Sequence, residues 1–269
     1  MEDRVWIEKF IKDFFLTEST IYTLFGSKPM SEIPLCCAAK GDWLSGYSKL
    51  IQNYPEEKKQ KALSELESYI DDYDLPINWN RWVNWSSKNL DRSFLFSKRT
   101  TDSKDLFSIY VVNVQETAWI LQKHYSLISR ELDMEFEPLQ AVLEFEDLDS
   151  LFWQKVFNSH FVQGILHGYG KRNSYFFDRK ILLQEKNTFD LYTHPIFKSA
   201  LDIKDKKKDL PLPRFRSFSS DLSQDPAHQK YQREKQQIRK TLKEKNKFDL
   251  VLKQLGYRAN FQSEEIAFN

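Results

Sequence analysis

The chain has 269 residues, of which 41% are hydrophobic, 15% aromatic and 29% charged, and its formal net charge is +1, which is typical of a soluble globular protein with a sizeable core. No apolar run approaches the roughly 20 residues that a transmembrane helix needs. The start, MEDRVWIEKFIKDFFL, intersperses charges among its apolar residues, so we expect a cytoplasmic protein or one exported without a cleavable signal peptide.

The cysteine and glycine contents exclude further classes. The two cysteines, Cys36 and Cys37, are adjacent and rarely bond to each other without strain, so we predict no disulfide. Three of the seven glycines lie between Gly164 and Gly170, which leaves little material for a P-loop or a dinucleotide-binding fingerprint.

Charge is distributed unevenly along the chain. From residue 198 to the end there are 17 Lys and Arg against 10 Asp and Glu, a net charge of +7, whereas the preceding residues carry 23 against 29, a net charge of −6. Prolines, serines and charges without periodicity follow residue 198. We therefore predict a globular body over 1–197, a flexible linker over 198–225 and a basic helical tail over 226–269.

Apolar periodicity predicts the first elements. Residues 4–16 form an amphipathic helix that docks on the body. The β-branched and aromatic stretch TIYTLF, over 20–25, predicts a strand followed by a loop over 26–34. Pro55 opens a second helix over 56–70.

Three tryptophans follow at three-residue spacing. Trp79, Trp82 and Trp85 alternate with asparagine and arginine, and such a set is a candidate aromatic platform for a sugar or a base. The alternative is that they anchor their segment onto the core.

Two strands and a helix are predicted next. Residues 93–98 and 106–112 are separated by a polar loop and predict an antiparallel hairpin. Asn113 and Glu116 form a pair that resembles a capping box at the start of a helix over 113–132, whose apolar residues make a single seam.

The most apolar segment lies in the middle of the chain. A short helix over 138–145 leads into residues 149–168, which predict one helix apolar on all sides and therefore buried at the centre of the body. Residues 174–183 continue the helical body.

Histidine and aspartate do not predict a metal site. His160 and His167 are seven residues apart, roughly 10 Å along a helix, which is too far to share one ion. Asp71, Asp72 and Asp74 do not match a calcium-binding loop. We predict no metal and no cofactor.

The tail predicts one long basic helix over 227–255 with a thin apolar stripe. Its cations are candidates for binding a polyanion, although solvated charge is the alternative. The candidate polyanion-binding residues are Lys235, Arg239, Lys240, Lys243 and Lys247.

Three segments resemble a group of uncharacterised proteins from bacteria of the chlamydial order: LFGSKPMS over 24–31, FWQKV over 152–156 and GILHGYGK over 164–171. The similarity covers roughly 21–177 and leaves out the basic tail. It implies a bacterial source with an intracellular lifestyle and carries over no catalytic residue, because the group has no assigned activity. At His167 and at 172–173 the chain departs from the pattern of the group, so no shared role is implied there.

Two glycine-containing loops form a candidate ligand-binding site. The loops cover residues 26–28 and 168–172. Loop 26–28 offers backbone N–H groups, a hydroxyl and an ammonium, the groups that bind an anion, although a simple turn is the alternative. The resemblance at both loops is the reason to pair them in one basic pocket. The candidate ligand-binding residues are Gly26, Ser27, Lys28, His167, Lys171 and Arg172.

These patterns predict a mostly helical α+β fold, in which residues 20–25, 93–98 and 106–112 form a small antiparallel or mixed sheet packed on the seam of helix 113–132. We expect a non-enzymatic interaction protein whose tail, through residues 228–247, binds an acidic protein, nucleic acid or an anionic membrane. The alternative is a small-anion-binding or ligand-binding protein, or an enzyme, that uses the pocket between the two loops.

Overall fold

The structure is a computed structural model. It describes residues 2–16, 20–36, 44, 48, 52, 55–72, 75–100, 106–185, 210, 212, 213, 217, 219, 221–243 and 246–257.

A three-stranded antiparallel sheet organises the described chain. Its order is β1 (Met30–Cys36), β3 (Leu106–Asn113), β2 (Phe94–Thr100), so that β3 pairs with both other strands. Ile109 of β3 lies opposite Ile33 of β1 and Lys98 of β2. The mostly helical α+β fold that the sequence predicts is confirmed.

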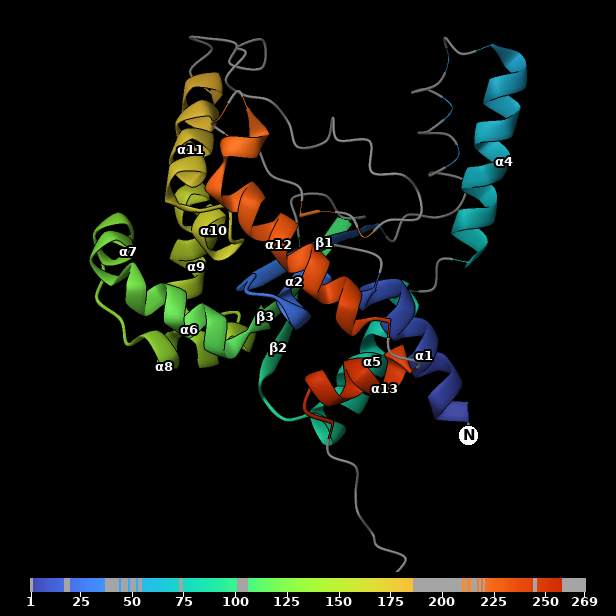
Figure 1. The fold of residues 1–269 in the computed structure, drawn as a ribbon, viewed down its shortest axis with the longest axis horizontal. Coiled ribbons are helices and arrows are strands. Elements are labelled where there is room, and N and C mark those ends of the chain that lie inside the picture. Colours follow the sequence, from blue (N-terminus) through green and yellow to red (C-terminus); the bar gives the residue numbers. More distant parts are fainter. Residues whose placement is uncertain are drawn as a thin grey trace, which may run out of the picture.

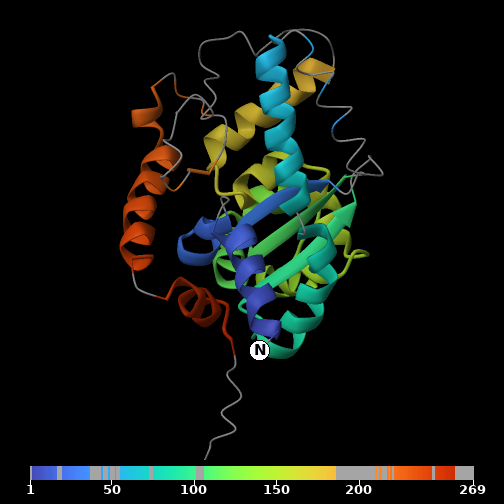
Figure 2. The ribbon, with the colours of Figure 1, turned by 90° about the vertical axis from the view of Figure 1, so that its right-hand side faces the viewer.

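Side chains of β3 alternate between two hydrophobic cores, because successive side chains of a strand point to opposite faces. Phe107, Ile109 and Val111 face the first core, which contains α1 (Glu2–Phe15), α5 (Leu75–Asn89) and α13 (Lys247–Gln254). Tyr110 and Val112 face the second. Figure 2 shows the sheet with α1 and α5 on its near side.

The second core is built by the helices that follow β3. They are α6 (Val114–Lys123), α7 (Tyr125–Leu132), α8 (Pro138–Leu143), α9 (Leu151–Phe157) and α10 (His160–Leu166). Asn113 caps α6 as predicted, since its side chain accepts a hydrogen bond from the N–H of Glu116. Trp153 is fully buried there and donates its indole N–H to the carbonyl oxygen of Ala141 at 2.7 Å. Burying a large apolar side chain contributes about 1.5–3 kcal/mol, so these two cores dominate stability.

The first strand of the predicted sheet differs from the prediction. Residues 20–25 form a helix, α2 (Thr20–Phe25), rather than a strand, and the third strand is β1, within and beyond the predicted loop. Thr20 and Thr23 are buried with their hydroxyls bonded to Phe14 O and to Ser31, so burial on all sides outweighs the β propensity of the segment.

Both long central helices are broken. The predicted helix 149–168 is divided into α9 and α10, because Ser159 leaves the helical conformation and caps α10 by accepting a hydrogen bond from the N–H of Val162. The predicted helix 113–132 breaks at His124, between α6 and α7. The buried character predicted for 149–168 nevertheless holds at Trp153, Val156 and Val162.

Helices α4 (Glu56–Asp72) and α11 (Lys171–Glu185) and two short 3-10 turns, Glu144–Glu146 and Leu222–Gln224, complete the described elements.

The C-terminal segment packs on the body. Instead of one long helix it forms α12 (Pro226–Thr241) and α13, with Asn246 capping the second. Tyr231 and Ile238 of α12 share a core with Ile21 and Tyr22 of α2. Figure 1 shows α12 running from the end of α10 and α11, across α2, towards α1 and α13.

This docking gives a testable stability effect. We expect Ile238→Ala to lower the free energy of unfolding by about 2–5 kcal/mol, because a buried isoleucine is replaced by a cavity. Urea denaturation followed by tryptophan fluorescence measures the change. Gln237→Ala, on the exposed side of the same helix, serves as the control and should change the free energy by less than about 0.5 kcal/mol. An unchanged midpoint for Ile238→Ala would show that α12 is not part of the cooperative unit.

Candidate functional site

The two predicted loops lie at one cavity of about 1000 Å³. Ser27 and Pro29 come from the loop after α2, and residues 168–173 come from the turn between α10 and α11 and from the first residues of α11. The remaining walls come from α6 and from the start of α12, including Trp119 and Lys230. We call this cavity the α6–α12 cavity.

Glycine shapes the turn between α10 and α11. Gly168 and Gly170 have φ angles of 77° and 80°, which L side chains rarely adopt. A Cβ at Gly168 would also clash with the hydroxyl of Tyr231, which donates a hydrogen bond to the Gly168 carbonyl oxygen at 3.1 Å. The turn therefore presents backbone directly to α12.

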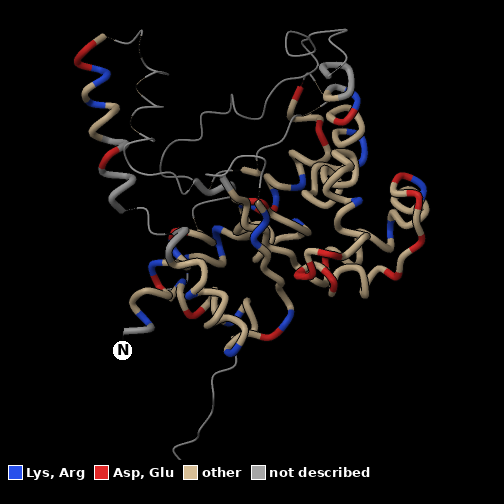
Figure 3. The backbone as a smooth tube through the Cα atoms, turned by 180° about the vertical axis from the view of Figure 1, so that it is seen from behind, with Lys and Arg blue, Asp and Glu red and all other residues tan. Residues whose placement is uncertain are grey.

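Four cations from three parts of the chain line the cavity: Lys123, Lys171, Arg172 and Lys230. The ammonium of Lys230 donates to the carbonyl oxygen of Ser27 at 3.0 Å. Burial lowers the pKa of Lys230, Glu234 and Glu116 oppose that shift, and Lys123 adds to it. Figure 3 shows that Lys and Arg are spread over many elements, so this convergence is a product of the fold.

The shifted pKa of His124 also indicates that cations lie close together at this cavity. Burial lowers the pKa of this cavity-lining imidazole, and the charges of Lys123 and Lys171 lower it further. The cations therefore lie close enough to repel an additional positive charge in the cavity.

The N-terminus of α11 opens on the cavity with an unusual charge. No acidic residue lies in its first turn, which instead begins with Lys171 and Arg172, and Gly170 precedes it. A cation at this positive end of the helix dipole costs roughly 0.3–1 kcal/mol, which a bound anion would offset. By contrast, the first N–H groups of α12 are capped by Asp225.

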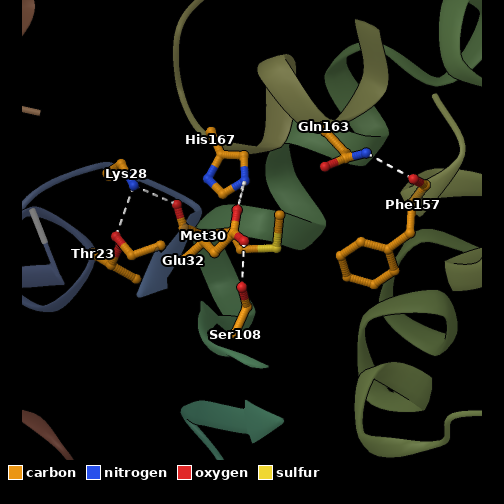
Figure 4. A network of polar contacts seen from close by, with 9 residues as sticks. Thr23, Lys28, Met30, Glu32, Ser108, Phe157, Gln163 and His167 are labelled. Carbon is orange, nitrogen blue, oxygen red and sulfur yellow. Dashed lines mark hydrogen bonds and ion pairs between the residues drawn. The ribbon is translucent and has the colours of Figure 1, made fainter. Parts of the chain in front are cut away.

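Three predicted ligand residues, Gly26, Lys28 and His167, do not line this cavity. The side chain of Lys28 is 1% exposed and donates to the carbonyl oxygen of Met30 and the hydroxyl of Ser31, both at 2.7 Å. Burial lowers its pKa to about 7, partly opposed by Glu32. As a direct ligand contact, Lys28 is a wrong prediction, because its side chain turns inward to the start of β1, two residues later (Figure 4).

The imidazole of His167 joins the same buried network. Its Nε2 lies 3.9 Å from a carboxylate oxygen of Glu32, and its ring stacks on Tyr169 with centroids 5.6 Å apart. Burial, and then the charge of Lys28, lower the pKa of His167 to about 3. His167 is therefore neutral at physiological pH, and its ring packs against Tyr169 of the turn between α10 and α11.

Gly26 and Ser27 contact α12. A Cβ at Gly26 would clash with the carboxylate of Glu234, and the N–H of Ser27 donates to that carboxylate at 3.3 Å. The hydroxyl of Ser27 donates to its other oxygen. Of the predicted ligand residues, Ser27, Lys171 and Arg172 thus line the cavity.

Sequence reasoning missed the contributions of α6 and α12. The sequence does not predict that Trp119, Lys123 and Lys230 line a cavity, because this depends on how α6 and α12 dock on the rest of the chain. The lysines themselves were visible as charges, but no local pattern distinguishes them from solvated ones.

The predicted aromatic platform is wrong. Trp79 and Trp82 lie in the core, where Trp82 is fully buried and stacks on Phe10 with centroids 4.6 Å apart. Trp85 is partly buried and stacks on Tyr257. Helical spacing placed these rings on the inner face of α5, so they anchor it.

The predicted polyanion-binding residues are divided by the docking of α12. Lys235 is 5% exposed and cannot present its charge to a partner, which corrects that assignment. The other four members of the set, Arg239, Lys240, Lys243 and Lys247, are exposed.

Within the described parts of the chain, no group of three or more His, Cys, Asp or Glu side chains could hold a metal ion. None of the described helices is both long enough and apolar enough to cross a membrane. The chain matches no known family model, no curated protein and no solved structure.

The buried lysine predicts a pH effect on stability. Lys28 is lowered to a pKa of about 7 in the folded protein, whereas an unfolded lysine titrates near 10.5. Between these values the unfolded chain binds more protons, so this residue makes stability rise with pH, by up to about 1.4 kcal/mol per pH unit.

We therefore expect the difference in unfolding free energy between the wild type and Lys28→Met to shift in favour of the wild type from pH 7 to pH 9. Urea denaturation at pH 6, 7.5 and 9 measures it. A difference that stays constant over this range would mean that Lys28 remains charged when folded.

Proposed function

We propose that the protein binds a small anionic ligand, carrying phosphate or carboxylate groups, in the α6–α12 cavity. The convergence of Lys123, Lys171, Arg172 and Lys230 on one cavity carries this proposal. Its volume of about 1000 Å³ lies at the upper end of typical ligand pockets.

The four cations of the cavity outnumber its two acidic residues, Glu116 and Asp225. Asp225 accepts hydrogen bonds from Asn173, from Ser217 and from the first N–H groups of α12, so its carboxylate is occupied by the protein. Glu116 acts on Lys230, whose pKa it raises. Lys171 and Arg172, at the start of α11, are exposed and line the cavity, so their charges can meet a ligand.

Binding of inorganic pyrophosphate tests the proposal. We expect pyrophosphate to raise the melting temperature of the full chain in a concentration-dependent manner, because a ligand that binds only the folded state stabilises it. The double variant Lys171→Ala/Arg172→Ala should weaken binding at least about tenfold in titration calorimetry, since each charged hydrogen bond contributes roughly 1.5–3 kcal/mol.

Lys240→Ala is the matched control, because it removes an exposed cation that does not line the cavity. Equal weakening by Lys240→Ala and by the double variant would indicate diffuse charge attraction and would contradict a cavity site. The absence of any shift with pyrophosphate would contradict the proposal as well.

We also propose a second candidate function, polyanion binding by the exposed cations at the end of α12 and in the turn after it, which we call the outer face of α12. The observation that favours it is that Arg239, Lys240 and Lys243 are exposed with no acidic residue between positions 235 and 243. Such a surface suits an acidic protein, nucleic acid or an anionic membrane.

Vesicles with anionic and with neutral headgroups test this second function. We expect Arg239→Ala/Lys240→Ala/Lys243→Ala to abolish salt-sensitive co-sedimentation with anionic vesicles, because attraction between exposed charges is screened by salt. Far-ultraviolet circular dichroism should stay unchanged, since the three side chains are exposed. Equal sedimentation of the wild type and the triple variant would exclude this face as a membrane-binding surface.

A further inference from the structure

A second cavity shares one lining residue with the first. It has a volume of about 670 Å³ and is lined by parts of α7, α9, α10 and α11, including Arg130, Tyr175 and Arg179. Lys171 lines both cavities, so its side chain lies between them at the start of α11. We call the pair the α11 groove.

Each cavity exposes one aromatic ring beside a cation. Trp119 is 54% exposed, and the ammonium of Lys123 lies 4.4 Å from its ring centroid. Tyr175 is 45% exposed, and the guanidinium carbon of Arg179 lies 5.2 Å from its ring centroid. Among the described Phe, Tyr and Trp residues, the one other exposed ring is that of Tyr257, which stacks on Trp85.

The α11 groove carries an excess of positive charge. Its acidic residues are Glu116, Glu131, Asp178 and Asp225. Its basic residues are Lys123, Arg130, Lys155, Lys171, Arg172, Arg179 and Lys230, seven cations against four acids.

We propose that the α11 groove binds a single-stranded oligonucleotide, an inference that rests on the proposed anion site and extends it. Bases stack on Trp119 and Tyr175. The phosphates between them pair with Lys171 and Arg172 at the junction.

The alternation of rings and cations selects this ligand. Single-stranded nucleic acid repeats a flat ring and a negative charge along one chain, and proteins bind it by combining stacking platforms with a basic groove. An acidic peptide supplies repeated charge without a ring in each unit, and a membrane surface cannot follow two concave cavities.

Fluorescence anisotropy of labelled oligothymidylates with the full chain tests the proposal. Lengths of about four and about twelve nucleotides bracket the smaller site sizes of stacking grooves. We expect the longer strand to bind more tightly and in a salt-sensitive manner. Trp119→Ala and Tyr175→Ala should each weaken binding about 5- to 150-fold, the equivalent of one lost base stack, whereas Trp119→Phe and Tyr175→Phe should largely retain it.

Tyr175→Ala separates this inference from the proposed function, because Tyr175 lines the second cavity and not the first. The expected pattern is unchanged pyrophosphate binding with weakened oligonucleotide binding. Unchanged binding of both ligands would overturn the groove and leave the anion site standing. Failure of pyrophosphate to bind the wild type would remove the anion site itself.

Two further outcomes would overturn the proposal. Oligoglutamate that binds as tightly as the oligonucleotide, with no loss in Trp119→Ala, would assign the groove to an acidic peptide. Loss of oligonucleotide binding in Arg239→Ala/Lys240→Ala/Lys243→Ala, with full binding by Tyr175→Ala, would assign nucleic-acid binding to the outer face of α12.

Discussion

The contact of Tyr231 with the turn between α10 and α11 is the constraint on which the candidate site depends. The ring of Tyr231 is fully buried against Tyr22, and its hydroxyl reaches the backbone of Gly168. This one side chain joins α12 to α2 and to the turn, and these elements carry the cavity-lining Lys230, Ser27 and Lys171.

The two loops that flank the cavity also share a buried polar cluster, which contains Lys28, Glu32 and His167. Lys28 and His167 give up solvation, which lowers the pKa of both groups and costs stability at low pH. In return the amine of Lys28 fixes the backbone at Met30, the first residue of β1. Such groups are retained where they hold one loop conformation, and here the loop is the wall of a cavity.

The sequence predicted what depends on local chemistry. The capping of α6 by Asn113 and the strand pair β2 and β3 follow from short-range patterns, and both are present. Residues 20–25 were misassigned because a short buried helix and a buried strand share the same apolar composition. β1 was missed because it contains Pro34, which suits an edge strand but reads as a loop.

The site was less predictable than the fold because its members come from distant segments. The thin apolar stripe of the tail is compatible with a free helix or a docked one, and only the complementary surface of α2 decides between them. The docking of α12 also divides the cations of the C-terminal segment into partly or fully buried ones and exposed ones. Lys230 and Lys235 turn towards the body, while Arg239, Lys240 and Lys243 stay outside.

This division links ligand binding to the docking of the C-terminal segment. A ligand held by Lys171 and Lys230 together bridges α11 and α12, so it binds only the docked arrangement. Any ligand that binds one arrangement alone stabilises it by mass action. An anion in the α6–α12 cavity would also reduce the mutual repulsion of the cations that docking brings together. If an anion occupies the cavity, docking of α12 and binding of the ligand therefore favour each other.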